Sequence, residues 1–381
     1  MNFKLTEREL EVQKLARDFA QNEIAPVVMD FDESQEFPME IAKKLGDIGF
    51  LGIIFPEEYG GSGFSITEYA IIIEEISKVD PSMGLTIAAH NGLCTNHIYS
   101  FSNDDLKKKY LPDLTSGNKL GAWGLTENVS GSDAGAMATT AERRNGHYVL
   151  NGSKIFITHG NVGETAVVMA VTDKSLGNKG ISAFIVEKGW SGFKVGKKEN
   201  KLGMRASDTA ELIFENLEVP AENLIGEEGA GFKQALQILD GGRIAIAALS
   251  VGIAQGAFEH SLKYSLERKQ FGQNLSKFQS TQFKLSDMAT EIEAARLLTY
   301  KAAYLKEHGK DINLAASMAK YFASEIATKA TNEAIQIHGG YGFIKEFPVE
   351  KLYRDVKLMT IGEGTSEVQK LIIARHIINQ F

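Results

Sequence analysis

The chain has few of the residues that define several common protein classes. Its 381 residues include a single cysteine, Cys94, and seven prolines. One cysteine excludes an intrachain disulfide and a cysteine-rich zinc site, and it fits a reducing compartment. The eight histidines do not occur in H-E-x-x-H or another ligand spacing, so we predict no metal. A G-x-S-x-G elbow and a cysteine–histidine motif are also missing, which argues against covalent catalysis.

Net positive charge and long apolar runs are missing as well. The net charge of −8 argues against nucleic acid as the main partner, because phosphate binding needs a basic surface. No run of about 18 uncharged apolar residues is present, so we expect no membrane span. Residues 1–7 enter a charged helical pattern without the apolar core of a signal peptide. The expectation is a mature cytoplasmic protein.

The length exceeds the size at which one hydrophobic core usually stops growing, so two or three domains are expected. The first of them, residues 1–119, is predicted to be helical. Thr6 with Glu9, and Ser65 with Glu68, are capping-box signals for two helix starts.

Residues 120–228 change to a strand-like pattern. The pairs Asn145-Gly146 and Asn151-Gly152 are signals for two-residue hairpin turns, and short β-branched or aromatic runs flank them. They predict an antiparallel meander, and further runs of the same kind indicate a small barrel or sandwich. We expect a separate antiparallel β-barrel domain.

Residues 229–381 return to the helical period, with three long amphipathic helices and a fourth over residues 367–378. Four helices are enough for a four-helix bundle. The order of helices, strands and helices predicts a multidomain α+β fold. It argues against a Rossmann enzyme, in which strands and helices would alternate.

Residues 361–369, Ile-Gly-Glu-Gly-Thr-Ser-Glu-Val-Gln, contain the strongest candidate for catalysis. Glu363 lies between two glycines, so the backbone there can bend sharply and another molecule can approach it closely. Ser366 and Gln369 give the S-x-x-Q signal of a helix start. A carboxylate on a bent connector before a helix can serve as a base. The alternative is an ordinary acidic residue that the helix macrodipole favours at a helix N-terminus.

Five other stretches combine glycines, small hydroxyl side chains and isolated charges. Residues 122–134 predict a strand followed by a loop rich in hydroxyls and backbone N–H groups, which is either a plain turn or a site for a heterocycle or pyrophosphate. Residues 156–158 place an aromatic ring beside a threonine, where the ring either stacks on a ligand or packs in the core. Residues 240–243, Asp-Gly-Gly-Arg, lie within a helical pattern, where each glycine destabilises by roughly 1 kcal/mol. Such glycines indicate that a neighbouring group needs the space.

The remaining two stretches lie at helix ends. Residues 268–272, Arg-Lys-Gln-Phe-Gly, are followed by Gln279 and carry a guanidinium that can cap its own helix or bind a phosphate. Residues 336–342 end a helix in three closely spaced glycines. No one of these stretches identifies a function alone.

Together the six stretches resemble the acyl-CoA dehydrogenase family, in the right order and over essentially the whole chain. Residues 239–244 and 363–367 make the sequence most similar to the short-chain, butyryl-CoA type. The resemblance implies a helical N-terminal domain, a β middle domain, a C-terminal helical bundle, FAD held between domains and subunits, and a homotetramer. It also implies oxidation of an acyl-CoA to a trans-2-enoyl-CoA, with electrons passed to an electron-transfer flavoprotein.

The resemblance further implies roles for residues at matching positions. Glu363 would be the base that removes the substrate α-proton. The flavin and its ribityl chain would be contacted by Leu125, Thr126, Gly131, Ser132, Phe156, Ile157 and Thr158. The rest of FAD would be held, from a neighbouring subunit, by Arg268, Phe271, Gln279, Gln336, Gly339 and Gly340, with Thr365 and Glu367 completing the site. The acyl-CoA would be bound by Ser132, Asp240, Gly241, Gly242, Arg243 and Gly364.

Three positions depart from the family pattern. Phe156 stands where many relatives have tryptophan, and His159 where asparagine is frequent. Gly362 precedes the base where a tyrosine often stands, and losing that ring should widen the acyl pocket for a branched or alicyclic group. Two rival functions are an acyl-CoA oxidase, which usually has a much longer chain, and a non-catalytic flavin-binding relative. The presence of Glu363 speaks against the second.

Overall fold

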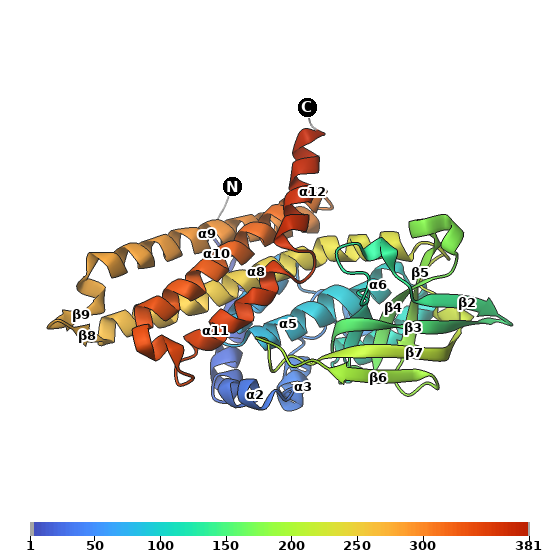
Figure 1. Cartoon of the computed structure of the whole chain (residues 1–381), viewed down its shortest axis with the longest axis horizontal. Coiled ribbons are helices and arrows are strands. Elements are labelled where there is room, and N and C mark those ends of the chain that lie inside the picture. Colours follow the sequence, from blue (N-terminus) through green and yellow to red (C-terminus); the bar gives the residue numbers. More distant parts are fainter. Residues whose placement is uncertain (1–3, 380–381) are drawn as a thin grey trace.

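The computed structural model describes residues 4–379; residues 1–3 of the predicted N-terminal domain and residues 380–381 of the predicted C-terminal domain lie outside that range. Figure 1 shows an elongated molecule with the strands of the middle region at one end and the long helices of the C-terminal region extending to the other. The helical and β regions follow one another along the chain as the sequence predicts.

The N-terminal region is helical in the described residues. Thr6 with Glu9, and Ser65 with Glu68, form the two predicted capping boxes. A π-helical turn over residues 90–95 joins the buried helix that ends at Ala89 to the helix that begins at Asn96. The helices of this region are α1 (Glu7–Phe19), α2 (Val28–Ser34), α3 (Met39–Asp47), α4 (Ile66–Ser77), α5 (Pro81–Ala89), α6 (Asn96–Phe101) and α7 (Asp104–Thr115).

The middle region is a curled, mixed sheet of seven strands, with the order β1-β4-β2-β3-β7-β6 and β5 paired to β4. Most pairs are antiparallel, as expected, but β1 pairs with β4 in parallel, with Trp123 opposite Val167. The purely antiparallel expectation is wrong here because β1 pairs with a strand that is distant in sequence, which needs a crossover and not a hairpin. The strands are β1 (Gly121–Gly124), β2 (Thr140–Arg144), β3 (His147–Thr158), β4 (Thr165–Val171), β5 (Ile181–Glu187), β6 (Phe193–Lys198) and β7 (Thr209–Pro220).

Only one of the two asparagine–glycine pairs forms the predicted turn. Asn145-Gly146 forms the predicted two-residue turn between β2 and β3, and both residues have positive φ, 42° and 86°. Asn151-Gly152 does not form a turn, because it lies inside β3 at a register shift. A Cβ atom at Gly152 would collide with Thr139, so this glycine permits close approach of the segment just before β2.

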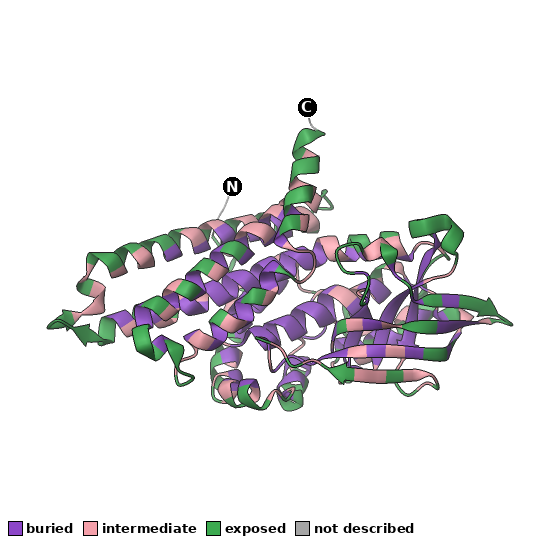
Figure 2. Ribbon diagram, viewed as in Figure 1, coloured by how far each residue is buried: buried purple, intermediate pink, exposed green. Residues whose placement is uncertain are grey.

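The C-terminal region is built around α8 (Gly231–Glu267), which packs against α9 (Gln279–Glu307) and α10 (Asn313–His338). The short helix α11 (Val349–Asp355) and α12 (Ser366–Ile378) follow, and a small hairpin of β8 (Lys269–Gln270) and β9 (Gln273–Asn274) closes the far end. The predicted fourth helix, α12, stands out from the side of the other three (Figure 1), and α4 instead packs against α8 and α9. Figure 2 shows the central part of α8 buried and α12 largely exposed.

Helix α8 is the only helix in the described residues that is long and apolar enough to cross a membrane. The most apolar stretch of this helix is nevertheless 78% buried inside the protein. Gly252 and Gly256 allow this burial, because a Cβ atom at either would collide with a backbone carbonyl of the α4 segment. The helix is therefore a core helix of the fold.

A buried ion cluster joins all three regions. The ammonium group of Lys351, in α11, donates to Asp80 at 2.8 Å and to Asp355 at 2.6 Å. The same Asp355 carboxylate accepts from the backbone N–H of Met204, in the segment between β6 and β7, at 2.5 Å. Burial alone would lower the pKa of Lys351, but the two aspartates raise it above its ordinary value. The lysine therefore stays charged inside the protein.

Candidate active site

Glu363 lies on a sharply bent connector between a 3₁₀ turn (Val356–Thr360) and α12. Its backbone is left-handed, with a φ of 54°, which is strained for a residue with a side chain, and Gly364 follows with a φ of 93°. The residue is half-buried, but its oxygen Oε2 is enclosed and has no hydrogen-bond partner among residues 4–379. Since buried polar atoms are normally paired, this one is a candidate for chemistry.

Gly242 in α8 provides the space for the Glu363 carboxylate. A Cβ atom at Gly242 would collide with Oε2, and the same atom would lie 3.5 Å from the Leu93 side chain. At Gly241, a Cβ atom would collide with the ammonium group of Lys306. The two glycines that are unfavourable for the helix therefore each make room for a charged group.

Two cations lie near this carboxylate, Lys320 of α10 and Arg243 of α8. Burial raises the pKa of Glu363 to about 7, and the charges of Lys320 and Arg243 oppose that rise. The phenol of Tyr69, in α4, has a raised pKa, chiefly because it is buried and second because of the charge of Glu363. Helix α4 therefore also adjoins this site. A carboxyl group that titrates near neutral pH is suited to proton transfer.

The predicted substrate-binding stretch of α8 adjoins this carboxylate. Asp240 and Arg243 form an ion pair at 2.6 Å, and Asp240 also accepts from the side chain of Asn313 at 2.7 Å. Arg243 is buried, and its Nε atom has no partner in the part of the chain that the structure describes. The guanidinium therefore keeps one N–H available for a bound molecule. The structure brings together the base and the predicted substrate contacts Asp240, Gly241, Gly242, Arg243 and Gly364.

The loop after β1 lies beside the end of β3. The Thr126 carbonyl accepts from the Ile155 N–H at 2.9 Å. The buried Glu127 carboxylate accepts from Lys154 Nζ at 2.6 Å and from two backbone N–H groups, so it holds the loop in shape. The predicted flavin contacts on this loop are the buried Leu125, the half-buried Thr126 and the exposed Gly131 and Ser132.

Phe156 presents its ring at the surface beside this loop. A register shift between Lys154 and Ile157 forms a bulge, and Phe156 within it has a φ of 59° and a 63% exposed side chain. Ile157 is buried and Thr158 half-buried. Bulges are common next to active sites, where they redirect a side chain. An exposed aromatic ring next to hydroxyl groups fits the face of a flavin.

The other two departures from the family pattern have different surroundings. His159 is fully buried, and its Nδ1 donates to the Gly121 carbonyl at 3.0 Å, so it ties β3 to β1 inside the sheet. Gly362 is half-buried, and a Cβ atom there would make only van der Waals contacts, the nearest with Leu358 at 3.4 Å. The connector therefore has room for a Cβ atom before the base.

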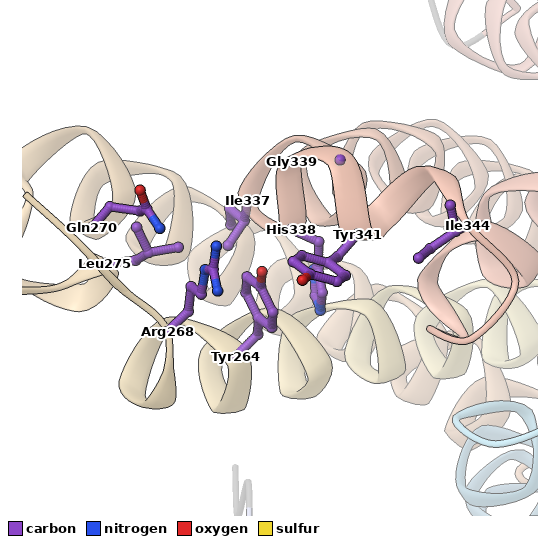
Figure 3. Close-up of a pocket in the computed structure, with 10 residues that line it drawn as sticks. Tyr264, Arg268, Gln270, Leu275, Ile337, His338, Gly339, Tyr341 and Ile344 are labelled. Atoms are coloured by element: carbon purple, nitrogen blue, oxygen red, sulfur yellow. The ribbon is translucent and has the colours of Figure 1, made fainter.

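The second group of predicted FAD contacts surrounds an open pocket of about 470 Å³ at the far end of the helices (Figure 3). Arg268 points into this pocket with its guanidinium 5.3 Å from the centre of the Tyr341 ring. Gly339 and Gly340 also line it, and a Cβ atom at either would meet nothing within 4 Å. The other predicted contacts at this end are all exposed: Phe271, Gln279 and Gln336.

These two groups of predicted FAD contacts do not meet within one chain. Arg268 adjoins β8, and Figure 1 places the β8–β9 hairpin at the opposite end of the molecule from the sheet that carries Phe156. Each group is open on its own, with an exposed aromatic ring in each: Phe156 is 63% and Phe271 94% exposed. Each half suits part of an extended dinucleotide.

Helix α12 starts one residue away from the predicted position. Thr365 is the N-cap, and its hydroxyl accepts from the Val368 N–H at 3.3 Å. The prediction that Ser366 caps the helix is wrong, because the bend of the connector ends at Thr365 and Ser366 is already helical. Gln369 instead donates to the Gly364 carbonyl at 3.0 Å, and Glu367 is exposed in the first turn.

Sequence reasoning did not single out Lys320. This residue is fully buried in α10, and its ammonium group donates to the Gly364 carbonyl at 2.7 Å. The available signal was its position on the same helix face as the buried Ala316 and Ala323. A lysine on a buried helix face is unusual unless it is paired.

The chain matches three family models, described as the N-terminal, middle and C-terminal domains of acyl-CoA dehydrogenase, at residues 6–118, 122–217 and 229–378. A short-chain specific acyl-CoA dehydrogenase of Clostridium acetobutylicum is 50% identical over 99% of this chain and 100% of its own. Butyryl-CoA dehydrogenase from Megasphaera elsdenii has the same fold with a TM-score of 0.98, at 46% identity over 99% of this chain and 100% of its own. A structure described as the electron transferring flavoprotein of Acidaminococcus fermentans also gives a TM-score of 0.98, at 49% identity and the same coverage.

The fold, the buried carboxylate and these matches define an FAD-dependent oxidoreductase that acts on CH–CH groups. The chain belongs to the acyl-CoA dehydrogenase family. The predictions of family, enzyme class and cofactor are thereby confirmed, as are the three-domain α+β fold, apart from its parallel strand pairing, and electron transfer to a flavoprotein.

Proposed function

We propose that this chain oxidises a short-chain acyl-CoA at its α and β carbons, with Glu363 as the base. The observation that carries the proposal is the enclosed, unpartnered oxygen Oε2 of Glu363, which occupies the space left by Gly242. Burial raises the pKa of this carboxyl to about 7, so it can both exist as a base and hold a proton near neutral pH. Two other carboxylates lie in the stretches assigned to binding, and each already has an ion-pair partner. Glu127 pairs with Lys154, and Asp240 pairs with Arg243.

The chemistry explains why one positioned glutamate suffices. A thioester α-proton is weakly acidic, so its removal needs a base together with stabilisation of the developing enolate oxygen. Glu363 takes the proton, and its own backbone N–H is the proposed donor to that oxygen. Bound FAD would supply the acceptor for the hydride that leaves the β-carbon. An apolar acyl chain that displaces water should raise the pKa of Glu363 further and strengthen it as a base.

For the substrate, we propose that Ser132 and the stretch from Asp240 to Arg243 contact the pantetheine and nucleotide of CoA. Gly364 would lie beside the thioester.

An electron-transfer flavoprotein is the proposed partner that reoxidises the enzyme, supported by the likeness to the Acidaminococcus structure. We propose a cytoplasmic location, supported by the burial of α8, the one long apolar helix in the described chain. Domain boundaries at residues 119–120 and 228–229 fit the change of element type.

FAD is proposed to bind across two copies of the chain in a homotetramer. The two groups of predicted contacts lie at opposite ends of one chain, and each is open. One copy would supply Leu125, Thr126, Gly131, Ser132, Phe156, Ile157 and Thr158, and its neighbour Arg268, Phe271, Gln279, Gln336, Gly339 and Gly340, with Thr365 and Glu367 completing the site.

Arg268→Ala should lower FAD retention and loosen the oligomer together, because the guanidinium is assigned to the cofactor of a neighbouring copy. Flavin absorbance per chain and analytical ultracentrifugation of the same sample measure the two effects. The matched control is Lys269→Ala, which removes an adjacent exposed cation of the same hairpin and should change neither. A stable Arg268→Ala monomer with full flavin would contradict the shared site.

Gly362→Tyr should narrow the acyl pocket and shift activity toward butyryl-CoA, by about 1–3 kcal/mol of discrimination per methylene-sized change. The backbone can accept a side chain at this position, since a Cβ atom at Gly362 meets only van der Waals contacts. Relative kcat/KM values over straight, branched and cyclic acyl-CoAs measure the shift. Gly362→Ala is the control and should keep the wild-type profile. An unchanged profile in the tyrosine variant would show that Gly362 does not set the pocket width.

Anaerobic bleaching of the bound flavin by the same acyl-CoA panel tests the function itself. A dehydrogenase should bleach with its substrate and then reoxidise slowly in air but quickly with an electron-transfer flavoprotein. Fast reoxidation by oxygen with release of peroxide would favour the oxidase. A yellow protein that no acyl-CoA bleaches would favour the non-catalytic relative.

A further inference from the structure

Lys320 is a buried cation that the proposed chemistry does not yet use. Its side chain is fully buried in α10, where a charged lysine is unfavourable without compensation. It forms no ion pair in the part of the chain that the structure describes, and its ammonium group donates only to the Gly364 carbonyl at 2.7 Å. Burial accordingly lowers the pKa of Lys320 to about 8, against the opposing effect of Glu363.

The group that Lys320 holds is the strained part of the connector. Glu363 and Gly364 both have left-handed backbones, with φ values of 54° and 93°. The carbonyl of Gly364 accepts from two side chains on different helices, Lys320 of α10 and Gln369 of α12. Two donors on one carbonyl fix the orientation of the peptide that follows the base, and such strain persists only where the surroundings hold it.

The charges around the base identify Lys320 as its least compensated cation. The groups whose charges act on Glu363, or on which its own charge acts, are Lys320 of α10, Arg243 of α8 and the Tyr69 phenol of α4. Arg243 is already paired with Asp240 at 2.6 Å. The carboxylates that act on Lys320 are Glu363 first, then Glu325 and Glu367, and Arg243 opposes them. Lys320 is thus the cation whose charge Glu363 chiefly compensates.

We propose that Lys320 is a positioning residue for the reaction: it anchors the bend that aims Glu363, and its charge favours the ionised, proton-accepting form of that carboxylate. The proposal rests on the assignment of Glu363 as the base. The buried charge of Lys320 would then serve the reaction, because one ammonium group would set both the geometry and the ionisation of the Glu363 carboxylate. Loss of the charge should raise the pKa of Glu363 and move its titration to higher pH.

The test is the pH profile of flavin reduction in the holoenzyme. Lys320→Met keeps the length of the side chain and removes the charge and the donor. The midpoint of the rise in reduction rate with pH should move up by about one pH unit, which is roughly a tenfold loss of rate below the midpoint. Lys320→Arg keeps the charge and should leave the midpoint within a few tenths of a unit of the wild type, even where the rate is lower. Lys329→Met, on the exposed face of the same helix and paired with Glu291, is the control and should overlay the wild type.

Two outcomes would overturn the proposal. A Lys320→Met enzyme with a uniformly lower rate but the wild-type midpoint would show that the lysine is only structural. A Lys320→Arg enzyme whose midpoint moves as far as expected for methionine would show that charge is not the cause, and this variant decides the matter if the methionine variant does not fold. Failure of the base assignment is separate, because it would appear as normal reduction in a Glu363→Gln enzyme whatever the Lys320 variants do.

Discussion

Replacing Glu363 with glutamine should remove most of the reduction of bound FAD by acyl-CoA, with a loss of about 10²–10⁴-fold or more. Glutamine keeps the size of the side chain and its backbone N–H but cannot accept the α-proton. The predicted FAD contacts lie mainly on other elements, so flavin content should stay at the wild-type level. Anaerobic stopped-flow bleaching with the best substrate measures the rate, and flavin absorbance per chain measures the retention.

No nearby carboxylate should rescue this variant. Glu127 is held by Lys154 at 2.6 Å, Asp240 by Arg243 at 2.6 Å, and Asp133 is exposed. The control is Glu291→Gln, which removes a carboxylate of α9 that pairs with Lys329, and this variant should reduce flavin normally. Near-wild-type bleaching of the Glu363→Gln enzyme would mean that the base lies elsewhere.

Lys351→Met should destabilise the protein by about 3–5 kcal/mol, because it leaves two buried aspartates without their cation. Lys351 lies between Asp80 at 2.8 Å and Asp355 at 2.6 Å, and all three side chains are buried. The midpoint of urea unfolding of the holoenzyme, followed by tryptophan fluorescence, measures the effect.

The matched control is Lys345→Met, which breaks a surface ion pair with Glu33 in which both side chains are more than half exposed. Exposed pairs contribute only about 0–1 kcal/mol, so the control should unfold near the wild-type midpoint. If both variants unfolded at the same denaturant concentration, the buried cluster would not be holding the three regions together.

The helix starts and one turn could be predicted because they depend on residues close in sequence. Thr6 with Glu9 forms the capping box that its spacing predicts. Asn145-Gly146 turns between adjacent strands. Asn151-Gly152 carries the same local signal but does not turn, since only its close approach to Thr139, just before β2, shows why a glycine is needed there.

Features that depend on contacts between distant parts of the chain could not be predicted from short stretches of sequence. The parallel pairing of β1 with β4 and the outward direction of α12 follow from how the regions pack, not from any pattern within them. At the site, Gly242 and Glu363 were singled out separately, and only the family resemblance linked them. Lys320 was missed because a single lysine in a helix is usually solvated.

The buried cluster around Lys351 can form only late in the synthesis of the chain. Asp80, which caps α5, meets its lysine 271 residues later, and at about 5–20 residues per second a ribosome needs roughly 14–54 s to reach it. Until residue 267 is made, the apolar faces of α4 and α5 lack α8, and α9, α10 and α11 follow only later in the interval. The nascent chain therefore passes through a long period in which a chaperone that shields apolar helices would protect it from aggregation.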